Sequence, residues 1–359
     1  MEEERISGRQ FGILTFVMML APLIHAIPLR TAGAGRASWL ITFPVVIPLG
    51  VLFYFLFRCL ERMPEGSGMG DLYLLALGQR WGKLCCVLST FWIVTMLIED
   101  LRFYAERYVT AVYPETGLSL FYVALLLMML WISRGSLGAL ARTGKILFWV
   151  VMTTLAVVLV MAAPKMKLYN VWPVTDTDPR EVTMGTLRMI AVLAFAVPPT
   201  FLLGRVKWRS SKKGIVWWFV ILAVTMLLIA VEIFGVFGPE LTARLQVPFF
   251  TLAKEISFQR TVQGMEIIVA AMWVMSDTAL AGVKIFAAGE ALGRAFSIRR
   301  SEVVRAGLVC LTLPLCLLLP ESSFEMEGYY KKYGMPFNVA MGYFLPALAL
   351  TVGKLRHKW

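Results

Sequence analysis

Charge is scarce in this sequence of 359 residues, and histidine is almost absent. Asp, Glu, Lys and Arg make up 16% of the chain, whereas they make up about 25% of an average soluble domain. So few charges cannot cover a soluble surface, which excludes a soluble enzyme and a disordered tail. With only His25 and His357, the chain has no paired-histidine metal motif, and it has no Walker-type phosphate loop.

The cysteines form no recognisable site. The five of them, such as the adjacent Cys85 and Cys86, follow neither a metal-ligand spacing nor a disulfide framework. They lie in or beside apolar runs and are interpreted as small buried hydrophobic residues. The sequence therefore predicts no metal and no cofactor, and it excludes a disulfide-stapled secreted domain.

Long apolar runs are what the chain has instead. Segments such as Leu120–Ile132, Ile146–Ala163 and Ile215–Val231 approach or reach the length with which a helix crosses about 30 Å of hydrocarbon. The chain is therefore predicted to be an all-α polytopic membrane protein. Hydropathy and its charged or Gly/Pro boundaries indicate ten helices, at 10–29, 38–57, 83–112, 118–133, 145–163, 186–204, 214–237, 265–292, 303–320 and 336–353.

The distribution of Lys and Arg predicts the orientation. If the N-terminus is cytoplasmic, the loops on that face hold 21 basic residues and the opposite loops hold 10. This bias places both termini in the cytoplasm. The net charge of +12 is interpreted in the same way, as a membrane feature and not as a signal for nucleic acid.

The whole chain, 1–359, is predicted to be one transmembrane domain, because no connection carries an independent core. Ten helices suggest two repeats of five, at about 10–163 and 186–353. Two repeats with an odd number of spans enter the membrane from opposite sides, so these would be inverted. Secondary transporters are commonly built in this way, with their site at the repeat interface.

Prolines occur at matching positions in the first and sixth predicted helices. Pro22 and Pro28 flank one short segment, and Pro198-Pro199 end another. Proline removes a backbone donor and clashes with the preceding turn, so we expect both helices to break or kink. Prolines also kink membrane helices that bind nothing, but paired breaks in two halves are typical of transporter sites.

Such breaks expose backbone groups that hold a zwitterionic amino acid without any charged side chain. The predicted substrate-binding residues are therefore Pro22, Leu23, Ile24 and His25 in helix 1, Trp92 and Thr95 in helix 3, Phe195, Ala196 and Val197 in helix 6, and Asp277 and Thr278 in helix 8. His25 either contacts the ligand or is a buried structural partner. Asp277 either binds an amine, a cation or a proton, or pairs with Lys284 through an intervening group.

Helix 3 carries the densest intramembrane charge. Glu99, Arg102 and Glu106 fall on one face, where Arg102 can pair with both carboxylates, and Asp100 and Arg107 share a neighbouring stripe. Two interpretations remain open at this point. The cluster either lines an access path or links moving helices, or it is a self-neutralising network that fixes helix 3 in the bundle.

Several short segments resemble one known family. They are Ile6-Ser7-Gly8-Arg9-Gln10, Leu101-Arg102-Phe103 with Glu106, Leu140-Ala141-Arg142-Thr143, Asn170-Val171-Trp172-Pro173-Val174, Val247 to Ser257, and Met272-Trp273-Val274. Together they are similar to the GerAB-type B subunit of spore germination receptors. That family belongs to the endospore germination permeases, within the amino acid–polyamine–organocation transporter superfamily.

The resemblance implies a LeuT-like fold and the sensing of a small germinant, often an amino acid. It implies A-type and C-type receptor subunits as partners in the spore inner membrane. A proton- or sodium-coupled amino acid transporter is the alternative, in which Asp277, His25 or Glu99 would titrate or coordinate during transport. An enzyme is not expected, because nothing in the spacing brings His25 and an acid together at a lipid-accessible cavity.

Overall fold

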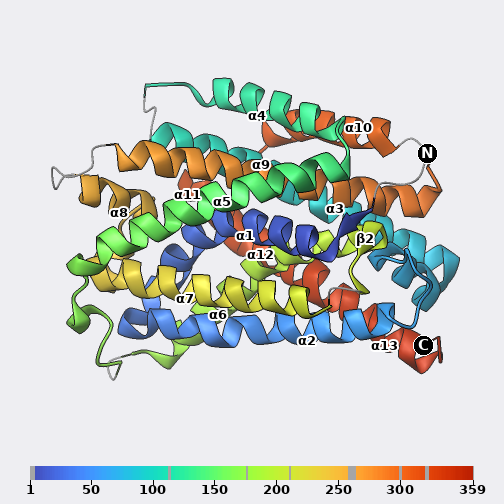
Figure 1. Ribbon diagram of the computed structural model, residues 1–359, viewed down its shortest axis with the longest axis horizontal. Helices are drawn as coiled ribbons and strands as arrows, with labels where there is room; N and C mark the ends of the chain where they lie inside the picture. The colour runs from blue at the N-terminus through green and yellow to red at the C-terminus, as the bar shows by residue number, and fades with distance from the viewer. Residues whose placement is uncertain are drawn as a thin grey trace.

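The computed structural model describes residues 5–111, 115–174, 177–209, 212–257, 264–298, 301–319 and 323–358. The chain is a bundle of long helices that run along one common direction (Figure 1). Its α-helices are α1 (Gly8–Thr31), α2 (Thr42–Leu60), α3 (Met69–Ala111), α4 (Leu118–Ser133), α5 (Leu137–Ala162), α6 (Pro179–Leu193), α7 (Lys212–Thr242), α8 (Pro248–Ser257), α9 (Met265–Phe296), α10 (Ser301–Cys316), α11 (Ser323–Tyr329), α12 (Met335–Val339) and α13 (Leu345–Leu355).

Tighter and wider helical turns join or extend these helices. The 3-10 segments are η1 (Ala32–Ile41), η2 (Ala163–Lys165), η3 (Leu168–Asn170), η4 (Ala194–Ala196) and η5 (Pro198–Arg205), and the π-helical turns are η7 (Tyr330–Gly334) and η8 (Ala340–Phe344). In η1, Gly35 has φ of 59° and ψ of −138°, which no L side chain adopts readily, and the chain turns there between α1 and α2.

Nine of the ten ranges predicted from the sequence lie on one helix or one run of helical turns, and the remaining one, 303–320, extends past the end of α10 at Cys316. Residue 112, at the end of the third range, and residue 320, at the end of the ninth, lie outside the described residues. Within the described ranges, seven helical runs are long and apolar enough to cross a membrane, and the first of them joins α1 to α2 through η1. The apolar helix α4 is shorter than those runs. The all-α membrane class is confirmed, whereas the count of ten crossings and the division into inverted repeats stay predictions.

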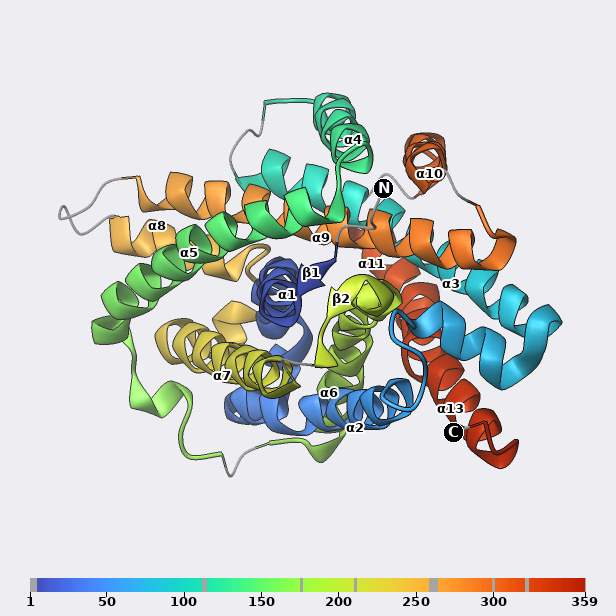
Figure 2. The same cartoon turned by 45° about the vertical axis from the view of Figure 1, so that its right-hand side comes forward.

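Helix α1 lies at the centre of the bundle. Figure 2 shows it almost end-on, surrounded by α5, α6, α7 and α9. All of its residues from Phe11 to Ile27 are buried except Thr15, Pro22 and His25, which are partly buried, as expected for a helix that is apolar around most of its circumference. The site described below is built against this central helix.

The predicted break in the first helix is wrong. Helix α1 stays α-helical from Gly8 to Thr31, with Pro22 and Pro28 inside it. Proline is tolerated there because neighbouring groups in a membrane bundle satisfy the backbone around it. Helix α1 therefore has no unwound backbone around Pro22 that could hold a ligand.

The predicted break in the sixth helix is confirmed. Helix α6 ends at Leu193, and the chain continues through the 3-10 segments η4 and η5 on either side of Val197. The adjacent prolines Pro198 and Pro199 lack the amide protons that an α-helix requires at these positions. This change of winding sets the direction in which Phe195 points.

The described chain begins and ends at the same end of the bundle (Figure 1). There, strand β1 (Ile6–Ser7) pairs in parallel with β2 (Val206–Lys207), with Ile6 opposite Val206. Ser7 then starts α1 through reciprocal hydrogen bonds with Gln10, a capping box. The beginning of α1 and the end of the helix-6 segment are thereby joined.

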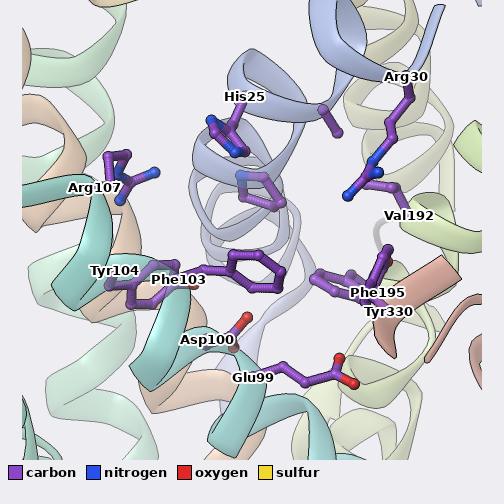
Figure 3. A pocket seen from close by; sticks show the side chains of 12 residues that line it. His25, Arg30, Glu99, Asp100, Phe103, Tyr104, Arg107, Val192, Phe195 and Tyr330 are labelled. Carbon is purple, nitrogen blue, oxygen red and sulfur yellow. The ribbon is translucent and has the colours of Figure 1, made fainter. Parts of the chain in front are cut away.

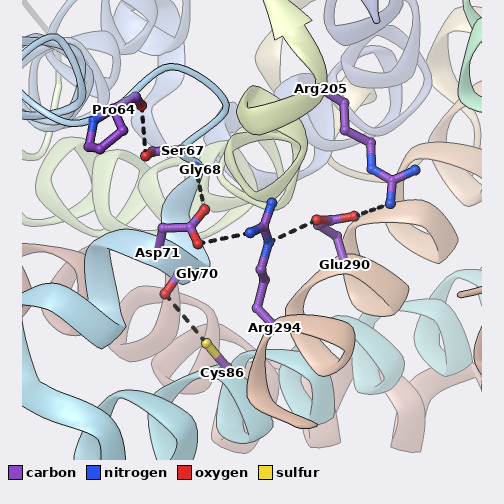
Figure 4. A network of polar contacts seen from close by, with 9 residues as sticks. All are labelled: Pro64, Ser67, Gly68, Gly70, Asp71, Cys86, Arg205, Glu290 and Arg294. Carbon is purple, nitrogen blue, oxygen red and sulfur yellow. Dashed lines mark hydrogen bonds and ion pairs between the residues drawn. The ribbon is translucent and has the colours of Figure 1, made fainter. Parts of the chain in front are cut away.

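A polar network connects three further elements at this end of the bundle (Figure 4). Arg294 Nη1 on α9 lies 3.0 Å from Asp71 Oδ1 on α3, and Arg294 Nε lies 3.1 Å from Glu290 Oε1. Glu290 Oε2 in turn lies 2.9 Å from Arg205 Nη2 at the end of η5. The ends of α3, α9 and η5 are therefore tied together.

We expect Gly204→Val to lower the free energy of unfolding by about 1–3 kcal/mol, the usual cost of overpacking. A Cβ at Gly204 would lie 2.5 Å from the carbonyl oxygen of Gly66, which is backbone and cannot move aside freely. Gly307→Val on α10 is the control, because a Cβ there has no heavy atom within 4 Å. Thermal unfolding in detergent measures both, and equal stability of the two variants would contradict this close contact.

Candidate functional site

A cavity lies where α1, α3, the end of α6 and the π-helical turn η7 meet. The volume within which the centre of a water molecule fits is about 80 Å³. By this measure one water needs roughly 10–15 Å³. The cavity is lined by Pro22, His25, Ala26, Arg30, Glu99, Asp100, Phe103, Tyr104, Arg107, Val192, Phe195 and Tyr330. It is large enough for several waters or for one small polar molecule.

Helix α3 supplies the longest wall of the cavity. Glu99, Asp100, Phe103, Tyr104 and Arg107 follow one another at the spacing that places residues on one face of an α-helix. Phe195 enters from the opposite wall at η4, where the winding of helix 6 changes. Tyr330 enters at the start of η7, and π-helical turns are frequent at functional sites.

The charges of the cavity are separated by sign. In Figure 3 the nitrogen-bearing side chains His25, Arg30 and Arg107 lie on one side of a belt of aromatic rings, and the carboxylates of Glu99 and Asp100 lie on the other. Glu99 is 3% exposed and Asp100 is 4% exposed. Charges at such depth are stable only when they are paired or hydrated. The arrangement is complementary to a small molecule that carries both an anionic and a cationic group.

One rim of the cavity is closed by an ion pair. Arg30 Nη1 near the end of α1 lies 2.9 Å from Glu327 Oε1 on α11, and the Arg30 guanidinium lies 5.1 Å from the centre of the Tyr330 ring. The Glu327 side chain is 49% exposed, whereas that of Arg30 is 11% exposed. This rim is therefore the part of the cavity wall nearest to the outside.

Two ion pairs join α3 to α9 beside the cavity. Lys284 Nζ lies 2.6 Å from Asp100 Oδ2, and Arg107 pairs with Asp277. Asp277 Oδ2 also accepts a 2.9 Å hydrogen bond from the hydroxyl of Tyr108. On each helix the two charges are seven residues apart, and the helices run antiparallel, so that each charge meets its opposite.

These contacts correct the predicted pairing of Asp277 with Lys284. Asp277 pairs with Arg107, and Lys284 pairs with Asp100, whereas the binding of an amine, a cation or a proton by Asp277 stays a prediction. Seven residues of helix separate Asp277 from Lys284 by about 10 Å, and each has a nearer opposite charge on α3. Lys284 also lies 4.0 Å from the centre of the Phe195 ring, directly behind the cavity wall.

Of the predicted network of Glu99, Arg102 and Glu106, the structure contains the pair Arg102–Glu106, while Glu99 lies in the cavity wall. Arg102 Nη1 lies 3.5 Å from Glu106 Oε2, as expected. Glu99, however, lines the cavity and packs against Gly334, where a Cβ would lie 3.0 Å from Glu99 Oε1. Helix 3 is thus not neutralised by its own residues alone, because Asp100 and Arg107 are neutralised by α9.

Of the predicted substrate-binding residues, Pro22, His25 and Phe195 line the cavity. The others, apart from Asp277, lie elsewhere. Leu23, Ile24 and Val197 are buried in the core, and Ala196 lines a separate apolar cavity. Trp92 Nε1 donates a 2.8 Å hydrogen bond to Asn338, while the hydroxyls of Thr95 and Thr278 donate to carbonyls of their own helices, those of Phe91 and Val274. The sequence interpretation did not include Arg30, Tyr104 or Tyr330 as contacts. The side-chain period of α3 could have indicated Tyr104 together with Glu99, Asp100 and Arg107.

The comparison with known proteins rests first on a family profile. The profile of one family, described as spore germination protein, matches residues 5–325. The chain belongs to the spore germination protein family. Spore germination protein KB of Bacillus subtilis (strain 168) is 19% identical to this family member over 272 residues, which are 74% of this chain and 72% of that protein.

Solved structures define the fold of this spore germination protein. A substrate-bound, outward-open Na⁺-coupled sialic acid symporter superimposes with a TM-score of 0.62 at 13% identity, over 98% of this chain and 91% of that chain. MhsT in complex with L-phenylalanine superimposes with a TM-score of 0.60 at 15% identity, over 98% and 99%. The LeuT-like fold is thereby confirmed, and this family member is an integral membrane protein of permease-like architecture.

Proposed function

We propose that this protein is the membrane subunit of a spore germinant receptor that binds a small zwitterionic germinant, an amino acid, and signals germination. The observation that carries the proposal is the cavity in which Arg30 and Arg107 face Glu99 and Asp100 across aromatic rings. A carboxylate fits beside Arg30, whose partner Glu327 is half-exposed, and an ammonium fits beside Glu99. Asp100 and Arg107 are already paired with Lys284 and Asp277 and supply the polar walls between these two positions. The family of the chain supplies the biological context.

The proposal includes the setting of the subunit. We place it in the spore inner membrane with both termini cytoplasmic, beside A-type and C-type receptor subunits. The position of both chain ends at one end of the bundle agrees with this topology, and the distribution of basic residues predicts the side. The inverted five-helix repeats at about 10–163 and 186–353 belong to the same proposal.

A thermal-shift screen tests the function. The purified protein, alone and co-purified with its A-type and C-type subunits, is heated with amino acids, nucleosides, sugars or inorganic cations. A ligand at 100 times its Kd stabilises the fold by about 2.7 kcal/mol if it binds only the native state. We expect a rise in the unfolding temperature with amino acids only. Stabilisation by another class alone, or silence in both preparations, would sink the proposal.

A proton- or sodium-coupled amino acid transporter is the second candidate. It is favoured by Asp277, whose Oδ1 is buried and accepts no hydrogen bond from the residues that the structure describes. Uptake of a stabilising amino acid into proteoliposomes distinguishes the two functions. Gradient-driven uptake that Asp277→Asn abolishes would establish transport, whereas binding without uptake would establish a receptor.

A further inference from the structure

A groove of about 480 Å³ lies between α2 and α7. Aromatic side chains form its walls, among them Phe53 and Phe57 on α2 and Phe219 on α7. Both helices turn apolar faces outward beside it: Ile47 and Val51 on α2, and Val216, Val220 and Val224 on α7, are between 42% and 63% exposed. In a membrane protein such faces contact hydrocarbon, so the groove opens toward lipid chains.

One end of the groove is polar. Arg58 stands in the last turn of α2 and lines the groove, where its Nη1 donates a 2.8 Å hydrogen bond to the hydroxyl of Tyr54. Trp208 lines the same end and is 4% exposed. Its ring lies 5.2 Å from that of Phe57, centre to centre. Tryptophan, tyrosine and arginine at a helix end are typical of the boundary between hydrocarbon and headgroups.

Trp208 also lines a second, polar cavity of about 250 Å³ beside the β1–β2 pair. Arg5, Lys207 and Arg209 contribute its positive charge, and Glu65 contributes a carboxylate. Arg209 is held in place by the end of α2 and the turn after it, because its Nη2 donates to the carbonyl of Leu60 at 2.9 Å and also to that of Met63. The linings of the groove and of this cavity together hold four cationic side chains against two carboxylates, Glu61 and Glu65.

Trp208 thus lies between an apolar groove on one side and a cavity with an excess of positive charge on the other. A soluble anion would leave the aromatic groove unfilled, and a lipid without net charge would leave the excess of cationic side chains unneutralised. Charge complementarity and an apolar chain are combined in an anionic phospholipid. We propose that one anionic phospholipid binds here, with an acyl chain between α2 and α7 and its phosphate among Arg58 and the Arg5–Lys207–Arg209 cavity.

Native mass spectrometry of the full chain, delipidated and then incubated with phosphatidylglycerol or phosphatidylcholine, tests the proposal. We expect phosphatidylglycerol to be retained at a ratio of one lipid per protein, and phosphatidylcholine to be retained several-fold less. Arg58→Gln removes a headgroup contact, and we expect about five-fold weaker retention, the equivalent of about 1 kcal/mol per basic residue near the membrane surface. Arg80→Gln, at an exposed arginine on α3 outside both linings, is the matched control.

A second variant acts on the acyl chain alone. A Cβ at Gly50 would lie 3.5 Å from the Phe219 ring, which is ordinary contact, so Gly50→Leu fills the groove without a backbone clash. We expect this variant to lose the lipid while Gly307→Leu, on the open face of α10, retains it. If Arg58→Gln does not fold, lipid retention by Gly50→Leu alone still tests the proposed site.

Three results would overturn the assignment. Equal retention of both phospholipids would show that the cationic side chains do not select the lipid. Unchanged retention in Gly50→Leu would show that the acyl chain does not lie in the groove. Competition by soluble glycerol phosphate at the same concentration as the lipid would show that a free phosphate, and not a membrane lipid, occupies the polar cavity.

Discussion

Replacing Lys284 with methionine is expected to lower the free energy of unfolding by about 3–5 kcal/mol, the usual cost of breaking a buried ion pair. Lys284 is fully buried, and its Nζ lies 2.6 Å from Asp100 Oδ2. The variant leaves the Asp100 carboxylate, which is 4% exposed, without its cation at a depth where an unpaired charge is costly. Unfolding in mixed micelles, followed by far-UV circular dichroism, measures the loss.

The double variant Asp100→Leu, Lys284→Met removes both charges and is expected to recover most of that loss, because apolar residues replace buried pairs without large cost. Lys83→Met, at an exposed lysine on α3, is the control for loss of a lysine as such. A Lys284→Met protein as stable as the Lys83→Met protein would show that the pair contributes nothing to the fold.

Glu99→Gln is expected to weaken binding of an amino acid by a factor of about 30 to several thousand. Removing one partner of a buried charge pair costs about 2–5 kcal/mol, and each 1.4 kcal/mol or so is tenfold in Kd. The reason is that Glu99 is the carboxylate nearest to η7 in the cavity wall, where it would meet the ammonium of the ligand. Isothermal titration calorimetry with the amino acid found in the screen gives the change in Kd.

Glu106→Gln is the matched control for Glu99→Gln. It stands on the same helix, but it pairs with Arg102 and lies outside the cavity lining. We expect its Kd to stay within about twofold of the parent protein, a difference of roughly 0.4 kcal/mol. If the two variants weaken binding equally, the ligand is not held by the carboxylate side of this cavity.

The helices were predictable from composition and periodicity because a membrane imposes length and apolarity on every span. The break at Phe195 to Pro198 was predictable for a local reason, two adjacent prolines. The continuity of α1 through Pro22 was not predictable, because the outcome for a single proline depends on the helices packed around it. Nothing in the local sequence reports that α1 is the central helix of the bundle.

The cavity itself was only partly predictable. His25 and Phe195 were placed in it by the search for helix breaks, although the break near His25 is absent. Arg30 and Tyr330 come from segments about 300 residues apart, and only tertiary packing brings them together. The pairs Asp100–Lys284 and Arg107–Asp277 left a signal in the sequence, namely an acid followed seven residues later by a base on each helix, an order that matches opposite charges when the two helices run antiparallel.

That seven-residue spacing has a consequence for movement. A slide of α3 along α9 by one helical turn, about 5.4 Å, would separate both pairs at once and leave four buried charges without partners, at several kcal/mol each. The two helices therefore have a single stable register and form the stationary wall of the cavity. Whatever opens or closes around a ligand has to be the other wall, α1 with α11 and η7, where the half-exposed Glu327 meets Arg30.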